Sequence, residues 1–127
     1  MEAYALTDAG RVRLHNQDYL YVSSAPVGSL ENLLLVADGM GGHNAGDYAS
    51  RFMVEGLTDY VKTSPESSPI QVLKSGIESI NLKLYEKSVE DMALSGMGTT
   101  LVAATVQENL LYVANVGDSR LYLFRHG

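Results

Sequence analysis

The order of sequence patterns predicts an α+β fold, in which strands and helices are grouped along the chain rather than alternated. Three strand-like segments come first, two amphipathic helices follow, and three more strand-like segments complete the chain. This βββ-αα-βββ order favours antiparallel strands with two antiparallel helices packed on one face. The 127 residues show no internal repeat and no linker, so we interpret them as part of one domain.

The strand-like segments of the first part differ in their apolar pattern. Residues 3–7 and 19–23 alternate in part and contain aromatic or β-branched side chains, which favours strands. Residues 32–37 are almost continuously apolar, which is typical of a strand buried on both faces. The connecting Ala-Pro-Val-Gly-Ser-Leu-Glu has the chemistry of a turn.

Two helices are predicted in the middle of the chain. The apolar and small residues of the first recur at helical spacing: Ala45, Ala49, Phe52, Met53, Gly56 and Tyr60. A second helix begins after residues 62–69, where Ser68 can cap, Pro69 takes the first helical position and Gln71 follows. Its apolar residues are Ile70, Leu73, Ile77, Ile80 and Leu84. The pattern predicts a helix that continues to about Glu90.

The last part of the chain is strand-like again. Residues 99–106, 110–116 and 120–125 are apolar segments separated by Gln-Glu-Asn and Gly-Asp-Ser. Short connections with turn chemistry predict a three-stranded antiparallel meander. Because the last strand ends two residues before Gly127, we expect the fold to continue beyond it.

The composition excludes several classes of function. The chain is 46% hydrophobic and 19% charged, which suits a packed core, and its net charge of -6 argues against nucleic-acid and anionic-membrane partners. The absence of cysteine excludes disulfides, zinc–thiolate sites and cysteine nucleophiles. The sequence has no apolar run near the roughly 20 residues of a membrane span, and its first residues do not resemble a signal peptide. We therefore expect a cytoplasmic protein.

A glycine-rich stretch, Val-Ala-Asp-Gly-Met-Gly-Gly-His-Asn-Ala-Gly, follows the apolar segment that ends at Ala37. It lacks the Lys-Ser or Lys-Thr of a phosphate loop, and Asn44 stands where a dinucleotide fingerprint needs glycine. Asp38 at a strand end, with glycines that let backbone carbonyls approach a ligand, suits a hard cation such as Mg²⁺ or Mn²⁺. For this segment alone, a metal site and an ordinary strand–loop–helix turn both remain open.

Three other polar clusters carry candidate residues. Between the first two strands, Arg13 could bind a phosphate through its planar guanidinium, and Gln17 and Asp18 could hold metal-bound water; a polar surface hairpin is the alternative. Asp118 lies in a tight Gly-Asp-Ser turn, which needs no function to explain it. Residues 95–100, Ser-Gly-Met-Gly-Thr-Thr, join helix to strand, and we interpret them as structural.

In their order along the chain, these motifs resemble the metal-dependent protein serine/threonine phosphatases of type 2C, in their bacterial form. The motifs are Gly10–Asp18, Val36–His43, Gly98–Thr100 and Val116–Arg120. The resemblance implies an α-β-β-α sandwich, in which two antiparallel sheets are flanked by helix pairs. Because the family's domain is longer, residues 1–127 are expected to be its N-terminal half, with one helix pair and part of each sheet.

The resemblance also implies a site with two cations, Mn²⁺ or Mg²⁺, that hydrolyses phosphoserine and phosphothreonine by an activated water. It implies that Asp38 bridges both cations and that the Gly39 carbonyl is a direct ligand. It further implies that Gln17, where many members have Glu, and Asp18 hold metal-bound waters.

Three more positions take roles from the resemblance. It implies that Arg13 is the clamp for the substrate phosphate and that Asp118 helps to bind a third, looser metal. Met40 takes the place of a histidine that animal members use near the leaving group, and bacterial relatives commonly lack that histidine. The implied partners are phosphoproteins modified by a serine/threonine kinase.

The motifs that supply the family's further aspartates, Ser-Asp-Gly or Thr-Asp-Gly and Asp-Asn, do not occur in the sequence. We therefore expect the 127 residues alone to be inactive. The alternative is a non-catalytic fragment or interaction module. Half a sandwich would leave strand edges and an apolar face uncovered, which predicts a homodimer or a domain-swapped oligomer.

Overall fold

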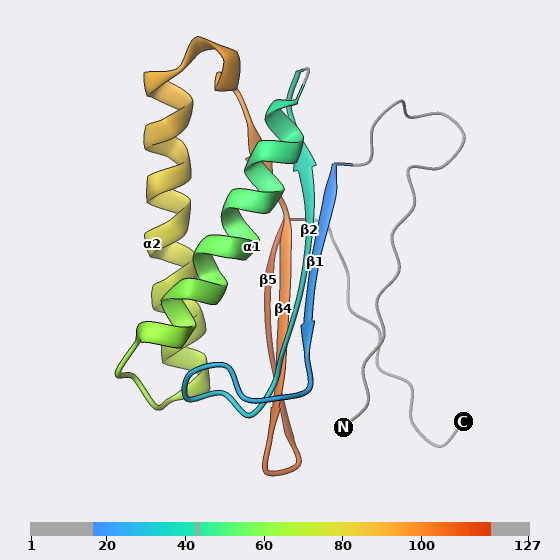
Figure 1. Ribbon diagram of the computed structural model, residues 1–127, viewed down its shortest axis with the longest axis vertical. Coiled ribbons are helices and arrows are strands. Elements are labelled where there is room, and N and C mark those ends of the chain that lie inside the picture. The colour runs from blue at the N-terminus through green and yellow to red at the C-terminus, as the bar shows by residue number, and fades with distance from the viewer. Residues whose placement is uncertain (1–16, 43, 118–127) are drawn as a thin grey trace, which may run out of the picture.

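The computed structural model describes residues 17–42 and 44–117, which form a sheet with two helices on one of its faces (Figure 1). The strands are β1 (Asp18–Ser23), β2 (Leu33–Met40), β3 (Gly98–Thr99), β4 (Leu101–Gln107) and β5 (Leu110–Val116). The helices are α1 (Ala45–Thr63) and α2 (Pro69–Glu90), and a short 3-10 turn follows at Met92–Leu94. The α+β class is confirmed. The strands expected at 3–7 and 120–125 lie outside the described residues.

The sheet has the strand order β1-β2-β4-β5, and β3 also pairs with β2. All of these pairings are antiparallel, as the sequence predicted for this class. The turn between β4 and β5 consists of Glu108 and Asn109, both with positive φ (50° and 69°). Positive φ at both turn residues matches the right-handed twist of a two-residue hairpin, so this connection is encoded locally.

The core lies between the sheet and α1. In β2, Leu33, Leu35 and Ala37 are fully buried and belong to one cluster with Leu57 of α1, while the intervening Val36 is 43% exposed. The expectation that this segment is buried on both faces is therefore wrong in the described structure. Val36 is exposed because both helices lie on the same side of the sheet and cover only the opposite face of β2 (Figure 1).

Small residues let the two helices approach each other closely. A Cβ atom at Gly56 would come 3.0 Å from the side chain of Ile80, and one at Gly76 would come 2.6 Å from that of Leu57. Larger side chains would force the helices apart. The expected apolar faces are correct in part: Phe52 is only partly buried and Ile70 is 47% exposed.

The start of α2 agrees with its sequence signature. The Ser68 hydroxyl accepts a hydrogen bond from the Gln71 amide at 3.4 Å, and Pro69 is the first helical residue. Of the helices in the part of the chain that the structure describes, none is both long and apolar enough to cross a membrane.

Candidate metal centre

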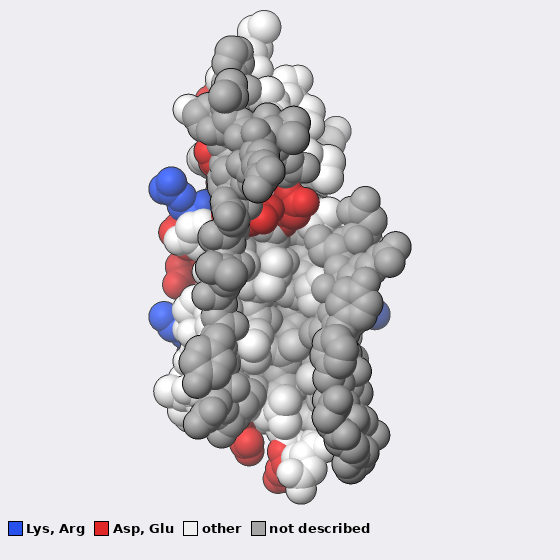
Figure 2. Space-filling model, turned by 90° about the vertical axis from the view of Figure 1, so that its right-hand side faces the viewer, with Lys and Arg blue, Asp and Glu red and all other residues white. Residues whose placement is uncertain are grey.

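Two aspartates, here called the aspartate pair, stand opposite each other at one end of the sheet. The β1–β2 register pairs Asp18 with Asp38. Residues directly opposite in an antiparallel ladder project from the same face, with Cβ atoms about 5 Å apart. In β2 this is the face that carries the exposed Val36 and Met40, so the aspartate pair lies on the side away from the helices. Figure 2 views this side, where carboxylates gather above a largely uncharged surface.

The charges of the aspartate pair favour a cation. Two carboxylates that project side by side from one face of a sheet repel each other. Carboxylate oxygens are the ligands that Mg²⁺ and Mn²⁺ prefer, and a divalent cation beside Asp18 and Asp38 would offset this repulsion. The chemistry of the donor set therefore fits the expected metal.

The described residues supply only part of a metal site. Among residues 17–42 and 44–117, no group of three or more His, Cys, Asp or Glu could hold a metal ion. Mg²⁺ takes about six oxygen ligands, so Asp18, Asp38 and the Gly39 carbonyl need further ligands or water. Of the other expected site residues, Gln17 is described, whereas Arg13 and Asp118 lie outside the described residues.

Thr100 holds the backbone of Asp38. The amide of Asp38 donates to the Thr100 hydroxyl at 3.2 Å, and the Thr100 amide donates to the Asp38 carbonyl at 3.0 Å. Thr100 is 4% exposed, so these bonds are shielded from water. The structural interpretation of residues 95–100 missed this specific contact, because only the pairing of β2 with β3 and β4 brings Thr100 beside Asp38.

β2 continues through Asp38 to Met40, whereas the sequence placed its end at residue 37. The reason is that Gly39 and Met40 pair with Thr99 and Gly98 of β3. The carboxylate of Asp38 therefore projects from a paired strand and not from a loop. A strand restrains its position more tightly than a loop would.

The glycines after Asp38 pack the start of α1 against β2. A Cβ atom at Gly39 would lie 1.9 Å from the carbonyl oxygen of Gly46, so only glycine fits there. Gly41 has φ 150°, a conformation that side chains disfavour, and its Cβ would come 2.9 Å from that of Ala45. The sequence suggested that the glycines give a ligand access to the backbone. The described contacts assign Gly39 and Gly41 to the packing of helix on strand.

Gln17 joins three parts of this region. Its backbone carbonyl accepts a hydrogen bond from the Gly39 amide at 3.0 Å, and its side-chain Nε2 donates to the Gly41 carbonyl at 3.3 Å. The side-chain amide also lies against Gly46, where a Cβ atom would come 2.5 Å from its Cδ and Nε2. The sequence analysis gave Gly46 no role. The signal that it missed is a glycine, a poor helix former, in the first turn of a predicted helix.

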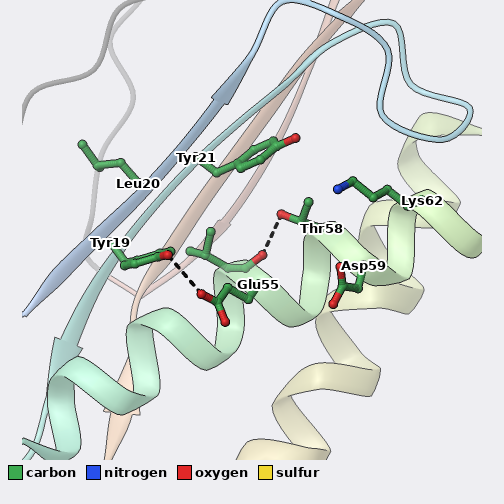
Figure 3. A pocket seen from close by; sticks show the side chains of 8 residues that line it. Tyr19, Leu20, Tyr21, Glu55, Thr58, Asp59 and Lys62 are labelled. Atoms are coloured by element: carbon green, nitrogen blue, oxygen red, sulfur yellow. Dashed lines mark hydrogen bonds between the residues drawn. The ribbon is translucent and has the colours of Figure 1, made fainter.

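A second polar cluster lies on the other face, between β1 and α1 (Figure 3). Tyr19 pairs with the buried Ala37, and its hydroxyl donates to the Glu55 carboxylate at 3.1 Å. That hydrogen bond, with some burial and the negative charge of Glu55, raises the pKa of Tyr19 above its usual value. Asp59 and Lys62 also line this open pocket of about 280 Å³. Because the pocket is on the helix side, it is separate from the aspartate pair, and its hydrogen bond ties β1 to α1.

Comparison with known proteins agrees with these features. Residues 8–127 match the sequence pattern of the family described as Protein phosphatase 2C. The chain is 41% identical to the serine/threonine phosphatase stp of Listeria monocytogenes, over 99% of this chain and 51% of that protein. It is 35% identical to the serine/threonine protein phosphatase PstP of Mycobacterium tuberculosis, over 97% of this chain and 23% of that protein.

Solved structures show the same similarity. The crystal structure of Stp1 from Staphylococcus aureus superposes with a TM-score of 0.77 and 37% identity, over 91% of this chain and 46% of that chain. The catalytic domain of PstP, solved with two manganese ions, gives 0.75 and 34%, over 89% of this chain and 46% of that chain. The chain thus spans about half the length of the stp proteins and of these solved chains.

Proposed function

The chain belongs to the protein phosphatase 2C family, and from this premise we propose that it supplies part of the active site of a metal-dependent protein serine/threonine phosphatase. The observation that carries the proposal is the aspartate pair. Asp18 and Asp38 project from one face of paired strands, and Gly39 follows directly. Oxygen ligands held on a rigid sheet are what a hard cation requires.

Each site residue has a role in this proposal. Asp38 and the Gly39 carbonyl would hold Mn²⁺ or Mg²⁺ ions, with the Asp38 carboxylate shared between two of them, and Gln17 and Asp18 would hold metal-bound waters. Asp118 contributes to a third, looser site. When bound, the cations supply positive charge that lowers the pKa of water and neutralises phosphate oxygens. The contacts of Asp38 with Thr100 support its role, because they fix the strand from which its carboxylate projects.

Arg13 binds the phosphate of the substrate in this proposal. A guanidinium presents paired N–H donors that match two phosphate oxygens, so Arg13 would orient the phosphoryl group and stabilise the negative charge that builds on it. Met40 has no titratable proton, so it cannot protonate the leaving group. Met40 is 52% exposed and lies two residues after Asp38 in β2.

The substrates in this proposal are proteins that a serine/threonine kinase has phosphorylated. A cytoplasmic location remains a prediction. We also propose that the chain self-associates through the sheet face away from the helices. Val36, Leu111 and Val113 support this, because they are 43%, 41% and 39% exposed. Light scattering at micromolar concentration is expected to show a dimer or larger species. A monomer would contradict self-association.

The test of the function is phosphate release from a phosphothreonine peptide by the natural protein that contains these 127 residues. We expect release that requires Mn²⁺ and falls to the metal-free rate in Asp38→Asn. Asp59→Asn is the matched control, because it makes the same change on α1 in the pocket on the other face. Release that survives Asp38→Asn would contradict the proposed role of Asp38. No release from the wild-type protein would favour a non-catalytic module.

The 127-residue chain is assayed beside the natural protein, with Mn²⁺ and p-nitrophenyl phosphate. We expect no turnover, because the described residues supply too few carboxylates for a metal site. Mn²⁺-dependent turnover that Asp38→Ala abolishes would show that the chain alone is active.

A further inference from the structure

The start of α1 lacks the local support that helices usually have. Asn44 occupies the N-cap position, but its side chain makes no capping hydrogen bond in the described part of the chain. The remaining local contacts are backbone bonds, such as that from the Ala45 amide to the Gly42 carbonyl at 3.0 Å. An uncapped first turn frays unless tertiary contacts hold it.

Gln17 supplies such contacts from a distant part of the chain. Its Nε2 donates to the Gly41 carbonyl, 24 residues further along, and its amide plane lies against Gly46 in the first turn of α1. Its own carbonyl meanwhile accepts from Gly39, the residue next to Asp38. One residue therefore touches the end of β2, the connection after it and the start of the helix.

The close contact between Gln17 and Gly46 indicates that the fit is specific. The three atoms nearest to a Cβ built at Gly46 all belong to Gln17, at 2.5, 2.5 and 2.7 Å. Gly46 is buried, so a methyl group there would have to displace the Gln17 amide. Alanine would otherwise be favoured in a helix over glycine.

We propose that Gln17 is a positioning residue, which fixes the start of α1 against the end of β2 through its Nε2 bond to Gly41 and its packing on Gly46. It thereby holds Gly39 and Asp38 in the geometry that a cation needs. An ionised carboxylate at position 17 would have no proton to donate to the Gly41 carbonyl, so in this chain that bond depends on the amide of Gln17. The inference rests on the proposed function for its purpose, but the contacts themselves do not depend on a metal.

The first test is amide hydrogen exchange of the metal-free 127-residue chain, compared with Gln17→Glu. We expect the Gly39 and Ala45 amides to exchange about five- to tenfold faster in the variant. The substitution removes the hydrogen bond to Gly41 and places a carboxylate oxygen, which only accepts, against the Gly41 carbonyl oxygen. Gln71→Glu is the control, because it adds the same charge at an exposed position in the first turn of α2. Unchanged exchange at both amides in Gln17→Glu would overturn the proposal.

The second test is a double-mutant cycle, which keeps the proposal falsifiable if Gln17→Glu does not fold. Gly46→Ala is expected to lower the unfolding temperature in the wild-type background, where the methyl group meets Gln17. In the Gln17→Ala background the same change is expected to raise it, because alanine favours the helix. Equal effects of Gly46→Ala in the two backgrounds would overturn the proposal.

A third measurement, Mn²⁺ binding by the natural protein, distinguishes a failure of the positioning role from a failure of the proposed function. We expect Gly46→Ala, which displaces the Gln17 amide without adding a charge, to speed the exchange of the Gly39 and Ala45 amides and to weaken Mn²⁺ binding, measured from the free-ion signal in electron paramagnetic resonance. Faster exchange with no Mn²⁺ binding even in the wild type would contradict the proposed function and leave the positioning role standing. Faster exchange with unchanged Mn²⁺ affinity would contradict the claim that this positioning serves the metal.

Discussion

The two long helices begin in different ways. α2 starts with a local signature, the Ser68 cap and Pro69, whereas α1 starts without a side-chain cap and rests on Gly39 and Gln17. The start of α2 is held by residues next to it in the sequence. The start of α1 is held by a residue of β2 and by the residue that precedes β1. The start of α1 thus contacts Gly39 and Gln17, the neighbours of the aspartate pair, and we expect a substitution at one of these places to alter the other.

The largest effect is expected from Gly39→Ala, which would remove the basis of this coupling. The new Cβ would meet the Gly46 carbonyl oxygen at 1.9 Å, so helix and strand must separate. We expect a loss of about 3 kcal/mol or more in the free energy of unfolding, measured with urea. Gly42→Ala is the control, because no atom lies within 4 Å of a Cβ there. Similar losses in both variants would show that the α1–β2 contact is not the cause.

Thr100→Val tests whether the hydrogen bonds of Thr100 hold β2 in place at Asp38, beneath the start of α1. The change keeps the shape of the side chain but leaves the Asp38 amide without the hydroxyl that accepts its hydrogen bond at 3.2 Å. Because Thr100 is buried, we expect a loss of about 2 kcal/mol in unfolding free energy. Thr100→Ser retains the hydroxyl and is expected to lose less. A greater loss in the serine variant would assign the effect to packing.

Ser68→Ala tests the start of α2, which is held by a local cap. It removes the acceptor of the Gln71 amide and is expected to reduce the unfolding free energy by about 1 kcal/mol. The exposed Ser67 provides the control Ser67→Ala, for which we expect a change within about 0.5 kcal/mol. Amide exchange should quicken in the first turn of α2 and stay unchanged at Ala45. Faster exchange at Ala45 would mean that the two helix starts are not independent.

The smallest effect is expected from Tyr19→Phe, which removes the link from β1 to the middle of α1. The folded pKa of Tyr19 lies above its unfolded value, because its hydroxyl donates to Glu55. The stabilisation is therefore complete below the unfolded pKa of about 10 and is lost as pH rises through the folded pKa. The stability difference between wild type and Tyr19→Phe should shrink above about pH 10. A difference that grows with pH would contradict the hydrogen bond.

Features that depend on neighbouring residues could be predicted from the sequence. The capped start of α2 and the turn at Glu108 and Asn109 follow from a few adjacent side chains, and both are present. The antiparallel pairing of β4 with β5 also follows, because a short connection leaves consecutive strands little choice.

Features that depend on distant pairing could not be predicted. The extension of β2 to Met40 needs β3, and the contact of Thr100 with Asp38 joins residues 62 positions apart. Periodicity carries no information about such a register. The candidate site itself was found only through the order of several motifs, because Asp38 and its glycines alone suit an ordinary turn equally well.

The central claim is that Asp38 lies at the centre of a divalent cation site, and Mn²⁺ binding by the natural protein tests it most directly. Electron paramagnetic resonance of free Mn²⁺ during titration reports binding without any substrate. We expect the wild type and Asp59→Asn to bind Mn²⁺ alike, and Asp38→Asn to bind it at least about tenfold more weakly. Equal Mn²⁺ affinity in Asp38→Asn and the wild type would contradict the claim.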